Sequence, residues 1–245
     1  MKLLTIDAFG TLFVPRPSVA AQYLRIVQQC EPYSGHVTQV QRNFHGAFKQ
    51  YYQQYPCYGK GKIGYESWWC HVIQQTFDNR ISLATAHKVY EHFGTSQAYH
   101  LYSDVIPLLT QVRSMGFKTA VLSNMDPKAH DILRDFGLDK YLDKVFISYD
   151  TEVDKPDENA WKNVEKEFGV SQRCYNSLYH VGDEPGKDLV SIPGWVSVLI
   201  DRSEGYTEYD GFAKNRAVKM RQGVLRVAED QYVVKDLGDV VDLLV

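Results

Sequence analysis

Residues 2–12 read KLLTIDAFGTL, a short apolar run that ends in an acid, Asp7, and is followed by a turn containing Gly10. Apolar runs of about four to eight residues bounded by turn signals are typical of strands buried on both faces of a parallel sheet. Ligands of such sheets bind beyond the carboxyl ends of the strands, so an acid at this position is a candidate functional residue. The stretch therefore predicts the first strand of an α/β sheet and the place of its site.

Further apolar runs of the same kind recur along the chain, at 118–123, 145–149, 178–181 and 195–200. Helical patterns separate them. One spans 104–115 and stops at Gly116, one begins at Asp126-Pro127 and stops at Gly137, and one begins at Pro156 and stops at Gly169. This alternation predicts an α/β core, a doubly wound (Rossmann-like) parallel sheet with right-handed crossovers.

Residues 15–97 interrupt the alternation with helical periodicity and no convincing strand. The helical segments are 18–29, 40–53, 65–77 and 83–93. We interpret this stretch as an inserted α-helical cap, which leaves 1–14 and 98–245 as the α/β catalytic core. The polar segment 203–232 is weakly patterned, and 233–245 returns to a strand followed by a helix.

Composition excludes several classes of protein. The 27 basic and 30 acidic residues give a net charge of -3, so no basic surface for nucleic acid is expected. No apolar run reaches the length of about 20 residues that a membrane span needs, and no targeting segment is recognisable. The four cysteines lack the spacing of a metal site and are expected to be free thiols. We therefore expect a cytoplasmic or nuclear protein, whose oligomeric state the sequence does not indicate.

Residues able to do chemistry follow four of the predicted strands. Their positions are Asp7 after the first, Ser123-Asn124 after the second, Asp154-Lys155-Pro156 after the third and Gly182-Asp183 after the fourth. The carboxyl ends of parallel strands lie at one edge of the sheet. We expect a carboxylate, a hydroxyl, an amine and a second carboxylate to meet there.

This ordered set resembles the motifs of the haloacid dehalogenase (HAD)-like hydrolase superfamily. The first motif reads Asp7-Ala-Phe-Gly-Thr-Leu, the second is Ser123, the third is Lys155-Pro156, and the fourth is Gly182-Asp183 followed by Asp188. Each motif alone is weak, but all occur in the family's order and span most of the chain. The segments Tyr58-Gly59, Trp68-Trp69 and Gln75–Phe77 also resemble the cap of one branch of this superfamily.

The resemblance implies phosphoryl transfer, in which a protein contributes mainly positioning and charge stabilisation. Asp7 would attack phosphorus and form an aspartyl phosphate. Mg²⁺, a hard ion that prefers oxygen, would be held by Asp7, the backbone carbonyl of Phe9 and Asp183. Asp188 would support the metal from outside its ligand set.

The resemblance also assigns the groups that hold the phosphate. Ser123 and nearby amides, including Asn124, would bind phosphate oxygens. Lys155 would bind phosphate and neutralise charge between it and Asp7, which makes Lys155 a catalytic residue beside Asp7. The expected partner is a small phosphorylated metabolite, not a nucleic acid or a membrane.

One position departs from the family's phosphatases, in which an acid stands two residues after the nucleophile. Here that residue is Phe9, which can offer a backbone carbonyl but cannot move a proton. Loss of positioned acid–base help costs roughly 10²–10⁴ in rate, or about 3–5 kcal/mol. A slow phosphohydrolase is therefore the favoured expectation.

Two alternatives stay open at this stage. The family's dehalogenases carry an aromatic residue at this position, attack carbon and need no metal, but they usually lack the acids of the fourth motif, which this chain keeps as Asp183 and Asp188. The other alternative is a phospho-ligand-binding protein that has lost catalysis.

Other polar and aromatic residues have simpler interpretations. Asp126 is expected to cap the helix that follows it, and Glu184 and Lys187 to be solvated charges, so none of them replaces the missing acid. His180 is expected to be a buried structural histidine. The tyrosines at 51, 52, 55 and 58 either face the substrate or pack inside the cap.

Overall fold

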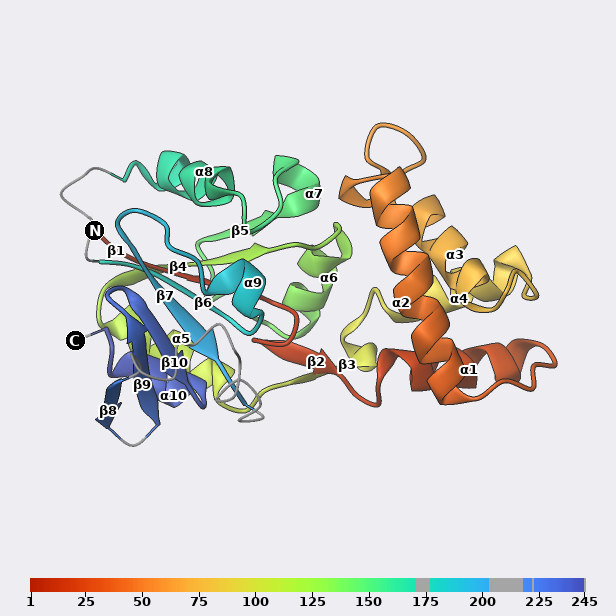
Figure 1. Cartoon of the computed structure of the whole chain (residues 1–245), viewed down its shortest axis with the longest axis horizontal. Coiled ribbons are helices and arrows are strands. Elements are labelled where there is room, and N and C mark those ends of the chain that lie inside the picture. The colour runs from red at the N-terminus through yellow and green to blue at the C-terminus, as the bar shows by residue number, and fades with distance from the viewer. Residues whose placement is uncertain (171–176, 203–217, 222, 245) are drawn as a thin grey trace. The chain divides into compact units, whose positions relative to one another are not determined.

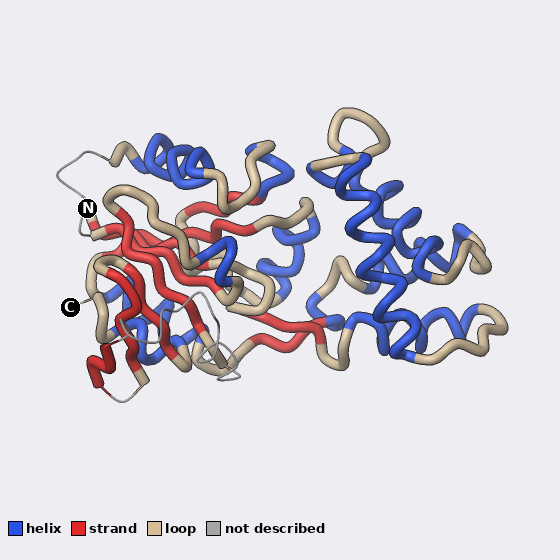
Figure 2. The backbone as a smooth tube through the Cα atoms, in the orientation of Figure 1, coloured by secondary structure: helices blue, strands red, loops and turns tan. Residues whose placement is uncertain are grey.

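The structure, a computed structural model, describes residues 1–170, 177–202, 218–221 and 223–244. Its internal contacts divide the chain into two compact units. The sheet unit comprises Met1–Val14, Leu101–Asn124 and Gly137–Val245, and the helical unit comprises Pro15–His100 and Met125–Phe136. Figure 2 shows the strands gathered in the sheet unit, while helices make up most of the helical unit.

The sheet unit is built on an eight-stranded mixed sheet in the order β5-β4-β1-β6-β7-β10-β9-β8 (Figure 1). The strands from β5 to β10 in this order are parallel, and β9 and β8 add an antiparallel edge. The bounds are β1 Lys2–Ile6, β4 Phe117–Ser123, β5 Lys144–Ile147, β6 Leu178–Gly182, β7 Trp195–Ile200, β8 Val218–Arg221, β9 Val224–Ala228 and β10 Gln231–Val234. The predicted parallel α/β sheet is confirmed.

Strand β1 lies between β4 and β6, and its register positions the end of each strand. Ile6 stands opposite Val121 on one side and Val181 on the other. The residues that follow these positions on the three strands therefore emerge at the same edge of the sheet. This order explains why groups more than a hundred residues apart in sequence meet beside Asp7.

Helices cover both faces of the sheet, as a doubly wound fold requires. Figure 1 draws α7 (Ser148–Thr151) and α8 (Glu158–Phe168) on one side of it, and α5 (Val105–Ser114) and α10 (Leu237–Val241) on the other. One apolar cluster joins α8 to the strands through Trp161 and Val164, which pack with Leu3, Leu122 and Trp195. Each fully buried Leu-sized side chain contributes roughly 1.5–3 kcal/mol, so this layer holds the strand ends in place.

Two pairs of strands were not predicted. The strands β8 and β9 lie in the segment that we interpreted as polar and weakly patterned. We did not predict β9 because it is a half-buried strand with Arg226 among its apolar residues. The short strands β2 (Phe13–Pro15) and β3 (Tyr99–Leu101) pair separately from the main sheet. Residues 203–217 of the polar segment lie outside the described residues.

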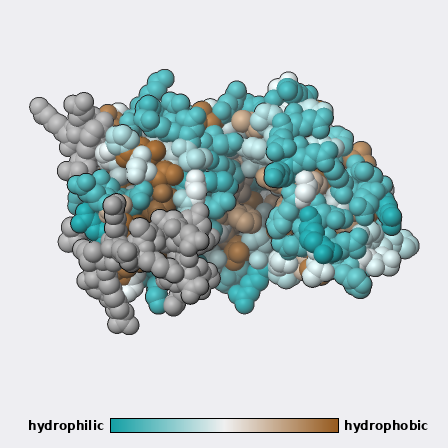
Figure 3. Space-filling view, in the orientation of Figure 1, coloured by the Kyte–Doolittle hydropathy of each residue, from teal (hydrophilic) through white to brown (hydrophobic). Residues whose placement is uncertain are grey.

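The helical unit contains the helices expected for the insertion. They are α1 Val19–Cys30, α2 Val37–Gln54, α3 Tyr65–Thr76 and α4 Leu83–His92, with short 3₁₀ turns at η1 Cys57–Gly59 and η2 Ser96–Ala98. Ser18 and Ser82 accept hydrogen bonds from backbone N–H groups at the starts of α1 and α4, which fixes where these helices begin. Tyr23, Ile73 and Phe77 belong to the apolar cluster inside the unit. Because these apolar side chains are buried, the face of the helical unit that Figure 3 shows is largely hydrophilic.

The division by contacts differs from the predicted one at residues 98–100 and 125–136, which belong to the helical unit. Long-range contacts hold α6 (Lys128–Asp135) there. Trp69 donates a hydrogen bond from Nε1 to Asp126 at 2.7 Å, and Lys128 lies over the ring of Tyr90 and bonds its carbonyl oxygen. Local sequence could not show these contacts, because each joins α6 to a helix at least 38 residues away.

The tyrosines of the helical unit pack against one another. Tyr52 and Tyr58 each make edge-on ring contacts with Trp68, and Tyr51 stacks on Tyr55. Packing inside this unit, the second interpretation of these residues, accounts for these contacts. Among the described residues, no helix combines the length and apolar character needed to cross a membrane. Of the cysteines, Cys30, Cys57 and Cys70 are free thiols, and Cys174 lies outside the described residues.

Candidate active site

Asp7 follows β1 directly and lies at the centre of the carboxyl edge of the sheet. Its backbone N–H donates to the carbonyl of Val181 at 2.8 Å, so the pairing with β6 continues one residue past the strand. The chain then turns tightly, since the N–H of Leu12 donates to the carbonyl of Ala8 at 2.8 Å. Asp7 is only 7% exposed, and its carboxylate is therefore held in a buried and defined position.

Lys155 reaches the same point from the loop between α7 and α8. Its Nζ lies 2.7 Å from Oδ1 of Asp7 and 2.5 Å from Oδ1 of Asp188, and the residue is 2% exposed. A buried ammonium with two carboxylate partners is a well-compensated charge. The predicted meeting of Asp7 and Lys155 is present in the geometry.

Asn124 holds the backbone of Lys155 with both ends of its side-chain amide. Its Nδ2 donates to the carbonyl of Lys155 at 2.8 Å, and its Oδ1 accepts from the N–H of Lys155 at 2.8 Å. The amide thus ties the end of β4 to the loop that carries the lysine. This contact gives Asn124 a positioning role, and its predicted binding of phosphate stays a prediction.

Asp183 follows β6 and faces the turn after Asp7. Thr11 donates from Oγ1 to Oδ1 of Asp183 at 3.2 Å. Gly10 has φ +88°, and a Cβ at this residue would lie 2.2 Å from Oδ2 of Asp183. Only glycine tolerates both the positive φ and the close approach, so Gly10 makes room for this carboxylate.

Asp188 ends the short helix α9 (Pro185–Asp188), and both of its oxygens are engaged. Besides Lys155, Oδ1 contacts Nε2 of His180 at 3.0 Å, and Oδ2 accepts from the backbone N–H of Glu184 at 2.9 Å. Gly182 leaves the space that the Asp188 side chain occupies, since a Cβ there would approach its Cγ to 2.1 Å. A fully engaged carboxylate suits the predicted supporting role better than direct metal ligation.

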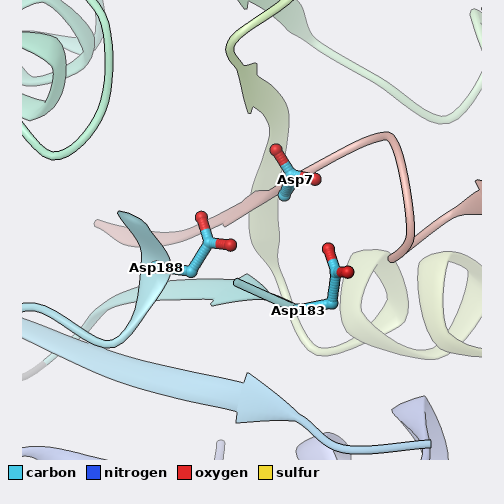
Figure 4. Close-up of side chains that lie close together, drawn as sticks. All are labelled: Asp7, Asp183 and Asp188. Atoms are coloured by element: carbon cyan, nitrogen blue, oxygen red, sulfur yellow. The ribbon is translucent and has the colours of Figure 1, made fainter. Parts of the chain in front are cut away.

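The three carboxylates form one cluster, which Figure 4 shows at the ends of β1 and β6 and on α9. Asp7, Asp183 and Asp188 each offer an oxygen that lies within 4.8 Å of the others. Lys155 compensates part of this charge, and an excess of negative charge remains. Clustered carboxylate oxygens with uncompensated charge fit a hard divalent cation such as Mg²⁺.

The electrostatics of Asp7 and Asp183 reflect burial and crowding. Burial raises the pKa of Asp7 to about 6; Lys155 opposes this rise, as does a hydrogen bond from the buried Ser123. Burial also raises the pKa of Asp183 to about 7, and repulsion from Asp7 and Asp188 adds to it. Carboxylates with raised pKa values next to each other are typical of functional sites.

The pKa values of the other three groups at the site move in different directions: that of Lys155 is raised, and those of Asp188 and His180 are lowered. Burial would lower the pKa of Lys155, but attraction by Asp7 and Asp188 outweighs it and the pKa is raised. Burial opposes ionisation of Asp188, but Lys155 and the hydrogen bond from His180 hold its pKa well below the usual range. Burial and the neighbouring ammonium of Lys155 lower the pKa of His180 to about 4. At neutral pH the lysine and Asp188 are therefore charged and the histidine is neutral.

Phe9 lies in the turn after Asp7 and is 44% exposed, with a backbone bridge to Phe13. The acids considered as substitutes for it are engaged elsewhere. The carboxylate of Asp126 accepts from the N–H of Lys128, the first residue of α6, at 2.9 Å and from Trp69; the cap position of α6 itself is Pro127 and not Asp126 as predicted. Glu184 forms an exposed ion pair with Lys187 at 2.5 Å.

The geometry thus gathers Asp7, Lys155, Asp183, Asp188 and Ser123, and reaches Asn124 through the backbone of Lys155. Three contacts were not predicted, those of His180, Thr11 and Gly10. A polar residue inside an otherwise apolar strand was the available signal for His180. Its burial was expected, but its partner Asp188 depends on how α9 folds back against β6.

Fold and site together define a Rossmann-like α/β domain with an aspartate–lysine centre at the carboxyl edge of its sheet. A family model described as haloacid dehalogenase-like hydrolase matches residues 1–192. The chain belongs to this family.

Similarity to individual proteins supports this family assignment. Haloacid dehalogenase-like hydrolase domain-containing protein 3 of Danio rerio is 31% identical over 208 residues, 81% of this chain and 84% of the relative, which confirms the resemblance to one branch. Glyceraldehyde 3-phosphate phosphatase of Methanopyrus kandleri is 34% identical over 106 residues, 42% of this chain and 44% of that protein. The crystal structure of an L-2-haloacid dehalogenase has the same fold, with a TM-score of 0.69 at 16% identity, covering 100% of this chain and 98% of that one.

Proposed function

We propose that this HAD-like hydrolase is a slow, Mg²⁺-dependent phosphohydrolase that forms an aspartyl phosphate on Asp7. The observation that carries the proposal is the cluster of Asp7, Asp183 and Asp188 around the buried Lys155. Such a cluster can place a nucleophile, a cation and a phosphoryl group within reach of one another. The expected substrate is a small phosphorylated metabolite, and the phosphatase among the relatives supports this class of ligand.

The donor set suits the metal. Asp7 and Asp183 would hold Mg²⁺ together with the backbone carbonyl of Phe9, and bound Mg²⁺ would neutralise charge between the carboxylates and the phosphate. Asp188 is occupied by Lys155, His180 and the Glu184 N–H, so it would act from outside the ligand set.

The side chains of the chain then have distinct tasks. Asp7 attacks phosphorus as a carboxylate, and the ammonium of Lys155 favours its ionised form. Lys155 lies where it can also shield the charge of the incoming phosphate, while Ser123 and backbone amides near Asn124 hold phosphate oxygens. Catalysis of this kind rests on positioning and electrostatics, which the buried network provides.

Phe9 sets the limits of the reaction. A phenyl group gives no proton to the leaving oxygen and takes none from the water that hydrolyses the aspartyl phosphate. The leaving group must therefore depart unassisted, so acyl and aryl phosphates should react far faster than alkyl phosphates. Attack of water on the aspartyl phosphate should also be slow. Because this second step is common to all substrates, the effect of the leaving group is read from kcat/KM, which reports the first attack.

A phosphate panel tests the proposal. Wild-type protein and Asp7→Asn are assayed with acyl, aryl and alkyl phosphates, each in Mg²⁺ and in chelator, with released phosphate as the measurement. The expected result is turnover of the first two classes in Mg²⁺ alone, lost in Asp7→Asn. Equal kcat/KM for alkyl and aryl esters would contradict the role of Phe9, and turnover by Asp7→Asn would contradict the role of Asp7 as the nucleophile.

A second candidate function is binding of a phosphorylated ligand without catalysis, and Phe9 is again the observation that favours it. The two candidates differ in one measurement. Binding of a phosphate analogue in Mg²⁺ without phosphate release from any member of the panel would select the binding protein.

A metal-independent dehalogenase is the third candidate, and the aromatic residue at position 9 favours it. The excess negative charge of the acid cluster disfavours it, because a 2-haloacid substrate is itself a carboxylate and would be repelled in the absence of a metal. Halide release from 2-haloacids in chelator, abolished in Asp7→Asn, would select this candidate.

A further inference from the structure

A chain of buried hydrogen bonds connects the interior of the sheet to Asp7. Thr5 Oγ1 lies 2.9 Å from Nδ1 of His180, whose Nε2 lies 3.0 Å from Oδ1 of Asp188. The same carboxylate oxygen contacts Lys155, which in turn contacts Asp7. Thr5 and His180 are register partners on β1 and β6, and both are fully buried.

The partners of His180 determine which ring nitrogen carries the proton. An ionised carboxylate only accepts hydrogen bonds, so the contact with Asp188 requires the proton on Nε2. Nδ1 of the neutral ring is then an acceptor. The hydroxyl of Thr5 can donate to it at 2.9 Å, a shorter contact than the 3.3 Å to its other acceptor, the carbonyl oxygen of Tyr179. The contact with Asp188 therefore fixes the tautomer, and the register of β1 and β6, which pairs His180 with Thr5, holds the ring on its other side.

We infer that His180 is a positioning residue that holds Asp188, and through it the ammonium of Lys155, in the geometry that the reaction at Asp7 requires. The catalytic part of this inference, the effect on the reaction at Asp7, rests on the proposed function. Its geometric part, the donation from Nε2 to Asp188, stands independently of any turnover.

A purely apolar packing role would not account for the contacts. Trp161 packs edge-on against the ring at 5.2 Å between centroids, and an apolar side chain of similar size could satisfy that contact. It could not donate to Asp188, whose oxygen would then be bound by Lys155 alone. The lysine would be drawn toward Asp188 or released from it, and its distance to Asp7 would change.

Four variants separate positioning from packing. His180→Gln keeps a donor near the place of Nε2, His180→Asn offers its amide only near Nδ1, and His180→Leu has no donor. Trp161→Phe changes the packing of the ring and leaves the hydrogen bonds intact. Substitutions that remove such outer hydrogen bonds typically cost about 10–100-fold in activity or metal affinity.

Three measurements are made on the full chain. They are kcat and KM for an aryl phosphate in Mg²⁺, affinity for beryllium trifluoride in Mg²⁺ as a mimic of the aspartyl phosphate, and the ¹⁵N NMR signals of the His180 ring. We expect a protonated Nε2 in wild type. We expect a loss of about 10–100-fold in kcat and in beryllofluoride affinity for His180→Leu and His180→Asn, with KM changed less, and recovery to within a few-fold in His180→Gln and Trp161→Phe.

Each opposite result overturns the inference. A proton on Nδ1 of the wild-type ring contradicts the geometry. Equal kcat and affinity in wild type and His180→Leu, or an equal loss in Trp161→Phe, shows that the ring only fills space. If His180→Leu does not fold, His180→Gln against His180→Asn makes the same comparison. If wild type releases phosphate from no substrate, the proposed function fails, while ring protonation and beryllofluoride affinity still decide the role of His180.

Discussion

The ammonium of Lys155 lies 2.7 Å from a carboxylate oxygen of Asp7, and both side chains are buried. Removal of a buried partner leaves the other charge uncompensated in a poorly solvated place, which costs much more than the net value of the pair. Here the loss would affect two carboxylates, because Asp188 shares the same ammonium.

We therefore expect Lys155→Met to lower the free energy of unfolding by about 3–5 kcal/mol and to abolish phosphate turnover. Urea unfolding at neutral pH measures the first effect. Lys144→Met is the matched control, since Lys144 pairs with Glu167 at 2.5 Å on the surface, where solvent screens the ion pair and its loss should hardly change stability. Similar losses in the two variants would mean that burial of the Asp7 pair has no energetic consequence.

Phe9→Asp should raise the turnover of alkyl phosphates by about 10²-fold or more, because it restores a group that can protonate the leaving oxygen. Position 9 is 44% exposed, so a carboxylate can be solvated there. Phe9→Asn is the matched control. Asparagine has nearly the size of aspartate and is also polar, but it moves no proton, so this variant should gain no activity on alkyl phosphates. If both variants gained equally, the benefit would come from polarity and not from acid–base chemistry. The measurement is kcat/KM on matched alkyl and aryl esters, which reports the step that expels the leaving group.

The parallel sheet could be predicted because its strands are buried on both faces and appear as continuous apolar runs, as in β7, whose predicted and observed bounds coincide at 195–200. The site could be anticipated for a related reason, since groups that follow parallel strands share one edge of the sheet. The strand β9 could not, because a half-buried edge strand such as VLRVA has no clear period in so short a segment.

Contacts between distant segments also could not be predicted from the sequence. Asn124 looks like an ordinary turn residue, and its bonds to Lys155 depend on the pairing of β4 with β5. The placement of α6 in the helical unit depends on Trp69 and Tyr90, which lie 57 and 38 residues from their partners. The local sequence pattern carries no information on contacts between residues so far apart in the chain.

The pKa of Asp183, raised to about 7, predicts a pH-dependent stability. A carboxyl group whose pKa is raised on folding binds its proton more tightly in the folded state, so its contribution to stability is lost as pH rises from about 4 through 7. Asp183→Asn stays neutral throughout. In chelator the variant should therefore become more stable than wild type as pH rises, by at most about 4 kcal/mol and by less where solvent screens the charge.

Urea unfolding in chelator at several pH values between 5 and 8 measures the difference between wild type and Asp183→Asn. The opposing contribution of His180, whose pKa is lowered, is present in both proteins and cancels. Added Mg²⁺ should stabilise wild type at pH 8 and the variant much less. A difference that does not change with pH would mean that Asp183 titrates like a solvated acid.

Gly10 and Gly116 provide a test of how Asp183 is held in place. Both have positive φ values, +88° and +81°, so alanine at either position should cost a similar backbone strain of about 1–2 kcal/mol. Their surroundings differ, because a Cβ at Gly10 would lie 2.2 Å from Oδ2 of Asp183, whereas a Cβ at Gly116 would have nothing within 4 Å. Gly10→Ala must therefore displace the Asp183 carboxylate, and Gly116→Ala leaves it in place.

Displacement of a group that binds or orients a metal typically costs about 10–100-fold in affinity. Calorimetric titration with Mg²⁺ should show this loss for Gly10→Ala alone, while urea unfolding shows similar destabilisation of both variants. Equal Mg²⁺ affinity in the two proteins would mean that the metal does not depend on the position of Asp183 beside the turn, and the assignment of Asp183 as a ligand would have to be abandoned.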